Sequence, residues 1–253
     1  AFGNKNIKNI KGEIEFKNVS FSYPNEGNTL NDFCLKLSPN KKIAIVGKSG
    51  QGKSTLFNLL TRIFDANDGE ILIDGINIKD LTEEQLRQHI SIIRQEPFIF
   101  NRTIEENFKL INNKINIKEI RKYCKLAYLD DYIMSLPDNY KTVLGEGGVN
   151  LSGGQKQRLS IARTLSKNSK IILFDEATSA LDNNSQEYIK RAIDSLVNNH
   201  TVIIVAHRLS TIIDADVIHV VDGGRVVASG RHDELLKTCS IYKNLYQSES
   251  SNS

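Results

Sequence analysis

The apolar positions of this chain follow two kinds of pattern, and together they predict an α/β fold. Near the N-terminus, Ile14, Phe16, Val19 and Phe21 roughly alternate with polar residues, as in a half-buried strand. Other runs are apolar throughout, which is typical of strands buried on both faces. These continuous runs are residues 43–46, 171–174 and 202–205, and the last of them is part of a predicted strand that starts at Thr201. Helical patterns separate them, and this alternation of strand and helix predicts a mostly parallel core sheet.

Two further patterns predict an antiparallel layer in addition to that sheet. Phe33, Leu35 and Leu37 alternate with polar residues as a second half-buried strand. Residues 70–73 form a mostly apolar run that ends at Asp74-Gly75, a common hairpin turn.

The stretch from residue 103 to residue 136 has a helical pattern and contains no glycine. Ile117, Ile120 and Cys124 fall on one helical face. We therefore expect a helical subdomain, at about residues 96–168, inserted in the α/β core.

Two short motifs predict where helices begin, and the polar composition of the two chain ends predicts the limits of the globular domain. Thr82 with Gln85, and Thr103 with Glu106, have the spacing of capping boxes, which open helices. The globular domain is predicted to span residues 13–247. The flanking residues 1–12 and 248–253 are polar, and we expect a flexible lead-in and a disordered tail.

Composition and charge narrow the function classes. The chain has 253 residues, of which 40% are hydrophobic and 25% are charged, an ordinary globular composition. The net charge of +3 is too weak a bias to argue for a surface built for nucleic acid or an anionic membrane. Cys34, Cys124 and Cys239 are far apart and odd in number, which predicts reduced thiols and no metal site.

The strand at residues 43–46 leads into a glycine-rich turn and a helix, which is the context of a phosphate-binding loop. Glycines let backbone N–H groups approach phosphate oxygens, and the helix N-terminus favours an anion. Lys53 then reaches the β- and γ-phosphates, and Ser54 offers its hydroxyl to Mg²⁺. The residues expected to contact the nucleotide are Gly47, Ser49, Gly50, Gln51, Gly52, Lys53, Ser54 and Thr55. The alternative is a glycine-rich turn without a ligand.

Polar side chains that follow apolar strands are expected at the same sheet edge, where open α/β sheets bind ligands. Asp175 has the position of a Mg²⁺ ligand, and Glu176 that of a group that orients an attacking water. Gln95 and His207 follow two other predicted strands. Each residue also has an ordinary structural alternative: a carboxylate caps the next helix, and a lone histidine is more often structural.

The order of these motifs resembles that of the nucleotide-binding domain of ABC transporters. The resemblance covers about residues 13–246 and includes Leu-Ser-Gly-Gly-Gln at residues 151–155, the most specific short motif of the family. Residues 103–107 and 145–150 are similar to segments of multidrug-resistance-type exporters. The resemblance implies a P-loop NTPase core with an inserted helical subdomain.

The resemblance also assigns roles residue by residue. Tyr23 matches the aromatic residue that stacks on adenine, although packing is the commoner role for a lone tyrosine. Residues 47–55 match Walker A, Asp175 the Walker B acid and Glu176 the catalytic carboxylate. His207 matches the switch histidine, which contacts the γ-phosphate. Gln95 matches the residue that touches Mg²⁺ and the attacking water, and Asp182 belongs to the loop that couples two sites.

The Leu-Ser-Gly-Gly-Gln motif at residues 151–155, the family's signature, implies partners for this chain. In the family, residues that match Ser152, Gly153, Gly154 and Gln155 face ATP held by a second nucleotide-binding domain, across a head-to-tail dimer. The resemblance therefore implies Mg²⁺-dependent ATP hydrolysis that powers export through a transmembrane domain. The domain itself is expected to be soluble and to lie at the cytoplasmic face of a membrane. Two alternatives are a soluble ABC ATPase that acts on nucleic acid or ribosomes, and a module that binds ATP without turnover.

Overall fold

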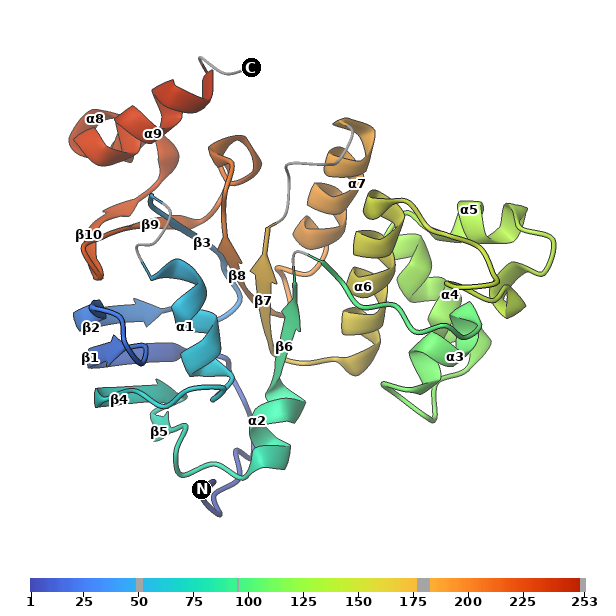
Figure 1. The fold of residues 1–253 in the computed structure, drawn as a ribbon, viewed down its shortest axis with the longest axis horizontal. Helices are drawn as coiled ribbons and strands as arrows, with labels where there is room; N and C mark the ends of the chain where they lie inside the picture. The colour runs from blue at the N-terminus through green and yellow to red at the C-terminus, as the bar shows by residue number, and fades with distance from the viewer. Residues whose placement is uncertain (49–51, 95, 177–182, 251–253) are drawn as a thin grey trace. The chain divides into compact units, whose positions relative to one another are not determined.

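The computed structural model describes residues 1–48, 52–94, 96–176 and 183–250 (Figure 1). Ser49, Gly50, Gln51, Gln95 and Asp182, all assigned roles above, lie outside the described residues. The chain forms two compact units. Unit 1 contains Ala1–Ile90, Lys170–Glu176 and the chain from Val197 onward, and unit 2 contains Ser91–Ser169 and the helix that ends near Leu196.

The core sheet of unit 1 is mostly parallel, as predicted. Strand β3 pairs in parallel with β8 and β9, β7 pairs in parallel with β8, and β10 joins β9 in an antiparallel hairpin. All residues of β3 and β8 are buried, which explains their continuous apolar sequences. The strands are β3 (Lys42–Val46), β7 (Ile171–Asp175), β8 (Thr201–Val205), β9 (Val217–Asp222) and β10 (Arg225–Gly230).

The predicted antiparallel layer is also present in unit 1, with its strands in the order β2-β1-β4-β5. A register shift in β1 lies between Phe16 and Val19, where Asn18 has a φ of 49°. This bulge explains why the apolar positions step by three residues there and by two elsewhere. The strands are β1 (Ile14–Ser22), β2 (Asn28–Leu37), β4 (Asp68–Ile73) and β5 (Ile76–Asn77).

Short helical elements, among them α1, α2, α8 and α9, complete the described part of unit 1 (Figure 1). The capping box predicted for α2 is only half formed: Thr82 accepts a bond from the Gln85 N–H, but the Gln85 side chain accepts from the Ile7 N–H. The prediction of a full box was therefore wrong, because a tertiary partner takes the Gln85 oxygen. The elements are α1 (Lys53–Leu60), α2 (Glu83–His89), η2 (Leu209–Thr211), α8 (His232–Thr238) and α9 (Ser240–Ser250).

Residues near the N-terminus form hydrogen bonds with unit 1, and a helix continues to Ser250 near the C-terminus. In the segment predicted to be a flexible lead-in, the Gly3 N–H bonds to the Leu81 carbonyl at 3.0 Å. The Asp74 carboxylate accepts from the N–H groups of residues 11–13 at 2.6–3.0 Å. At the other end, α9 continues to Ser250, beyond the predicted start of the tail. Backbone hydrogen bonds outweigh polar composition in both segments.

Unit 2 is built mainly from helices. The predicted helical block is interrupted twice, because Asn116 starts a new capping box and Tyr128 ends α4 with a left-handed φ of 55°. The Thr103–Glu106 capping box is confirmed. Strand β6 (Ile90–Ile93) begins at a residue of unit 1, and its other residues belong to unit 2. The helical elements of unit 2 are α3 (Ile104–Lys109), α4 (Ile117–Leu126), α5 (Asp130–Ser135), η1 (Asn139–Lys141), α6 (Gly153–Lys167) and α7 (Asn183–Asp194).

Within the described ranges, every helix is too short or too polar to cross a bilayer. The three cysteines are free thiols, and Cys124 is buried.

Candidate nucleotide-binding site

The helix that follows the predicted phosphate loop is α1, and two glycines fix the chain on either side of that loop. Gly52 has a φ of 88°, and a Cβ there would lie 2.9 Å from Leu30 Cδ2. A Cβ on Gly47 would lie 2.3 Å from the Val221 carbonyl oxygen. Both positions therefore need glycine for local packing, in addition to any role at a phosphate.

Lys53 starts α1 with its side chain buried beside the loop. Its Nζ donates to the Gly47 carbonyl at 2.5 Å. Burial lowers the pKa of Lys53, and the nearby Asp175 carboxylate acts in the opposite direction. An ammonium group at the start of a helix is a favourable setting for an anion.

Tyr23 is tied to α1 through its hydroxyl group. The hydroxyl oxygen lies 3.0 Å from Thr55 Oγ1 and accepts a bond from Asn58 Nδ2 at 3.0 Å. The ring makes edge contacts with Phe21 and Phe64, with centroids 4.8 and 5.2 Å away. These contacts show the packing role considered above, and stacking on adenine stays a prediction.

The ends of two neighbouring strands bring Asp175 and His207 together. Asp175 is the last residue of β7 and pairs in register with Val205 of β8. His207 follows β8, and its Nε2 lies 3.6 Å from Asp175 Oδ1. Because Asp175 also acts on the charge of Lys53, these three side chains share one electrostatic environment.

Glu176 is almost fully buried and is held by the turn after β8. Its Oε2 accepts bonds from the N–H groups of His207 at 3.1 Å and Arg208 at 3.4 Å. Burial raises the pKa of Glu176, and hydrogen bonds from Thr211 and these N–H groups oppose the shift. The carboxyl is thus a better proton acceptor than an exposed glutamate.

Glu249, which the sequence analysis did not identify, supports the same turn. Glu249, on α9, accepts a hydrogen bond from the Leu209 N–H at 2.8 Å through its Oε2. It also raises the pKa of Glu176 through its negative charge. No sequence signal pointed to Glu249, because it lies in the segment predicted to be a disordered tail.

In unit 2, Ser152 caps α6, and Ser152 and Gln155 of the signature form hydrogen bonds with each other. The Ser152 Oγ accepts from the Gln155 N–H at 3.2 Å, and the Gln155 Oε1 accepts from the Ser152 N–H at 2.9 Å. The spacing of a serine and a glutamine could have predicted this capping box. Gly153 begins the helix, and Gly154 is buried next to Ser185 of α7.

The donors in unit 1 fit a Mg²⁺–nucleotide. Asp175 supplies a carboxylate and Ser54, exposed in the first turn of α1, supplies a hydroxyl; both are oxygen ligands, which Mg²⁺ prefers. Lys53 and the first N–H groups of α1 suit phosphate oxygens. Lys53, Asp175, Glu176 and His207 lie near one another in unit 1, whereas Ser152, Gly153, Gly154 and Gln155 lie in unit 2.

Comparison with known proteins identifies the family of the chain. Residues 30–179 match the family model described as ABC transporter. The chain is 44% identical, over 98% of its length, to an ATP-dependent lipid A-core flippase of Saccharophagus degradans. It is 45% identical, over 94% of its length, to a putative multidrug export ATP-binding/permease protein of Bacillus subtilis. The chain covers 42% and 41% of these two relatives, respectively.

A solved structure of a bacterial Atm1-family ABC exporter with ATP bound is also similar. The TM-score is 0.88 with 38% sequence identity, over 97% of this chain and 44% of that protein. This chain belongs to the ABC transporter family, and it spans about two fifths of the length of the curated relatives it matches. The predicted α/β P-loop fold is confirmed.

Proposed function

We propose that this chain is the nucleotide-binding domain of an exporter, and that it binds and hydrolyses ATP with Mg²⁺. The observation that carries the proposal is the grouping of Lys53, Asp175, Glu176 and His207 at the carboxyl ends of β7 and β8 and the start of α1. Relatives named as a flippase and as a multidrug exporter support an export role. These relatives do not favour the alternative of a soluble ABC ATPase that acts on nucleic acid or ribosomes.

Each side chain has a distinct task in the proposed reaction. Lys53 would hold the β- and γ-phosphates, and Ser54, Asp175 and Gln95 would hold Mg²⁺. When bound, Mg²⁺ neutralises charge on the phosphate oxygens. Residues 47–55 wrap the phosphates, and Tyr23 stacks on the adenine ring.

Glu176 and His207 act on the attacking water and the γ-phosphate. The raised pKa of Glu176 favours transfer of a proton from water to its carboxylate. Because Glu176 accepts from the His207 N–H, movement of one residue affects the other. His207 donates from its ring to a γ-phosphate oxygen and lies close enough to Asp175 to be oriented by it.

The second half of the site comes from another copy or a related domain. The capping box of Ser152 and Gln155 fixes the N-terminus of α6, a helix of 15 residues whose dipole favours an anion. We infer that this end, with Ser152, Gly153 and Gly154, covers the γ-phosphate of ATP bound to the partner domain. ATP then stabilises the dimer, and hydrolysis releases it.

A transmembrane domain is the proposed partner for force transmission, at the cytoplasmic face of a membrane. Phe98 is 71% exposed, although its carbonyl is held by Arg163 Nη2 at 2.7 Å. Arg163 also donates to Asn107, which bonds to the backbone of Phe100. An exposed aromatic residue on a fixed backbone suits contact with another domain.

Phosphate release tests the proposal. We expect Mg²⁺-dependent release by the full chain, about 10²-fold slower or more in Glu176→Gln with ATP binding retained. Glu84→Gln, at an exposed position of α2, is the matched control and should keep the wild-type rate. Equal rates in wild type and Glu176→Gln would contradict the role of Glu176. No release with ATP bound would favour a module without turnover.

A further inference from the structure

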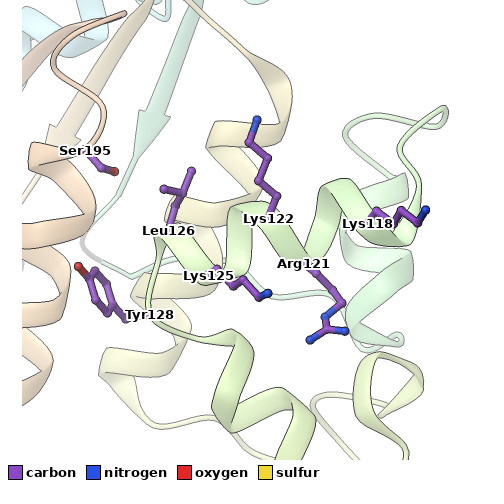
Figure 2. A pocket seen from close by; sticks show the side chains of 7 residues that line it. All are labelled: Lys118, Arg121, Lys122, Lys125, Leu126, Tyr128 and Ser195. Atoms are coloured by element: carbon purple, nitrogen blue, oxygen red, sulfur yellow. The ribbon is translucent and has the colours of Figure 1, made fainter.

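A hollow of about 630 Å³ lies on unit 2, along α4 (Figure 2). Four of its seven lining residues are basic and come from α4. We call it the α4 hollow. Its lining residues are Lys118, Arg121, Lys122, Lys125, Leu126, Tyr128 and Ser195.

The four basic residues share one face of α4. Lys118, Arg121, Lys122 and Lys125 are spaced at i, i+3, i+4 and i+7, and the buried Ile120 lies on another face. Like charges at these spacings repel one another and destabilise a helix. Helix stability alone therefore does not explain the stripe, although Lys125 also suits the negative C-terminal end.

Arg121 differs from the three lysines because an internal partner holds it. Its Nε and Nη2 donate to the two carboxylate oxygens of Asp130 at 3.1 and 3.0 Å. The buried Asp130 also accepts from the Tyr140 hydroxyl at 2.6 Å. Within the described ranges, Lys118, Lys122 and Lys125 form no ion pair with a carboxylate of the chain. These lysines give the α4 hollow its net positive charge.

The other end of the α4 hollow is apolar. Leu126 is 38% exposed and Tyr128 is 43% exposed. Tyr128 has a φ of 55° at a helix end, a position that glycine occupies at lower cost. Its ring stacks on Tyr188, with centroids 5.4 Å apart and planes at 23°. The chain thus maintains a large apolar platform beside the lysines.

We propose that the α4 hollow binds an acidic segment of a partner protein. Seven residues of helix separate Lys118 from Lys125, which is about 10 Å along the axis. Side chains on one face of an extended segment recur about every 7 Å, so two carboxylates reach different lysines. An apolar side chain of the segment then packs on Leu126 and Tyr128.

The site is less suited to a phosphate group. Phosphate recognition favours arginine forks and helix N-termini, and the Arg121 fork already holds Asp130. The lysines lie along the side of a helix and are spread along its axis (Figure 2). An isolated phosphate would also leave the apolar end unused.

Binding of a labelled peptide to the full chain tests this proposal. The probe is a fluorescent peptide of alternating Glu and Ser residues that ends in Leu-Phe. We expect anisotropy at low salt to show binding that is about tenfold weaker or more in Lys118→Gln/Lys122→Gln/Lys125→Gln. The control removes the same charge from exposed lysines of unit 1, as Lys8→Gln/Lys17→Gln/Lys237→Gln, and should bind as wild type. Leu126→Ser should weaken binding of this peptide but not of one without Leu-Phe.

A second measurement locates the site on the unmodified protein. Carbodiimide joins lysine amines to peptide carboxylates, and we expect the products at Lys118, Lys122 and Lys125. Products mainly at other lysines, or equal binding by the triple variant and wild type, would overturn the proposal. Tighter binding of inorganic polyphosphate or of phosphatidylserine vesicles than of the peptide would overturn it in favour of a phosphate ligand or a membrane.

Discussion

Gly154 and Ser185 approach so closely that a methyl group does not fit between them. A Cβ on Gly154 would lie 2.4 Å from Ser185 Oγ and 2.6 Å from Ser185 Cβ. The hydroxyl can rotate, but the Cβ moves only with the backbone of α7. The second glycine of the signature therefore sets the packing of α6 on α7, whatever its role at a phosphate.

Gly154→Ala should destabilise the chain by about 1–2 kcal/mol, because overpacking outweighs the helix propensity gained from alanine. Urea unfolding measures the change. Ser185→Gly removes both clashing atoms, so Gly154→Ala should cost little in that background. Equal costs in the two backgrounds would show that the α6–α7 contact is not the cause.

Tyr23→Ala should weaken nucleotide binding by about 1–2 kcal/mol, a typical loss for one stacked base. Tyr23→Phe keeps the ring and loses only the hydrogen bonds with Thr55 and Asn58, so it should bind nucleotide nearly as wild type. Titration calorimetry of both variants separates the roles. If Tyr23→Ala lowers stability but leaves the affinity unchanged, the residue serves packing alone.

His219 makes stability depend on pH below neutrality. It is buried in β9, and burial lowers its pKa from 6.5 to about 4. The unfolded chain then binds a proton that the folded chain does not. Above about pH 6.5 the histidine is neutral in both states and does not reduce stability. As the pH falls from 6.5 towards 4, protonation of the unfolded chain lowers the free energy of unfolding by up to about 3 kcal/mol. Unfolding of His219→Phe between pH 4 and 7 should show a shallower dependence; an unchanged slope would contradict this assignment.

Glu249→Ala should loosen the turn that follows His207. The N–H of the buried Leu209 loses its acceptor, and the cost is about 1–2 kcal/mol. Hydrogen exchange at Leu209 should accelerate and phosphate release should slow, because the turn carries His207. Glu249→Gln keeps an acceptor oxygen and is the matched control. If hydrogen exchange at Leu209 is unchanged in Glu249→Ala, Glu249 does not stabilise the turn after His207.

The sequence predicted the parts of the site that are local. Strands β3, β7 and β8 contain continuous apolar runs at residues 43–46, 171–174 and 202–205. The candidates Asp175 and His207 were predicted from where two of these runs end, and Lys53 from the motif that follows the other. The Thr103 box was predicted because both partners are three residues apart. These features depend on neighbours in the sequence, so pattern and spacing can predict them. The same spacing failed for Thr82 and Gln85, where Ile7 takes the Gln85 oxygen.

Contacts between residues on different elements could not be predicted from the sequence patterns. Glu249 and Leu209 are 40 residues apart, and composition indicated a tail at Glu249. The hydrogen bonds of residues 11–13 depend on Asp74, and the need for glycine at residue 154 depends on Ser185. Each partner lies on another element, and local patterns do not show which elements will pack together.

Light scattering of Glu176→Gln, with and without ATP and Mg²⁺, tests the central claim most directly. The account predicts the mass of one chain, 28.4 kDa, without nucleotide and twice that mass with ATP and Mg²⁺. Lys53→Ala/Glu176→Gln, which should not hold the phosphates, should remain a single chain under both conditions. A mass of one chain for Glu176→Gln while ATP is measurably bound would contradict a site completed by a second copy of the signature.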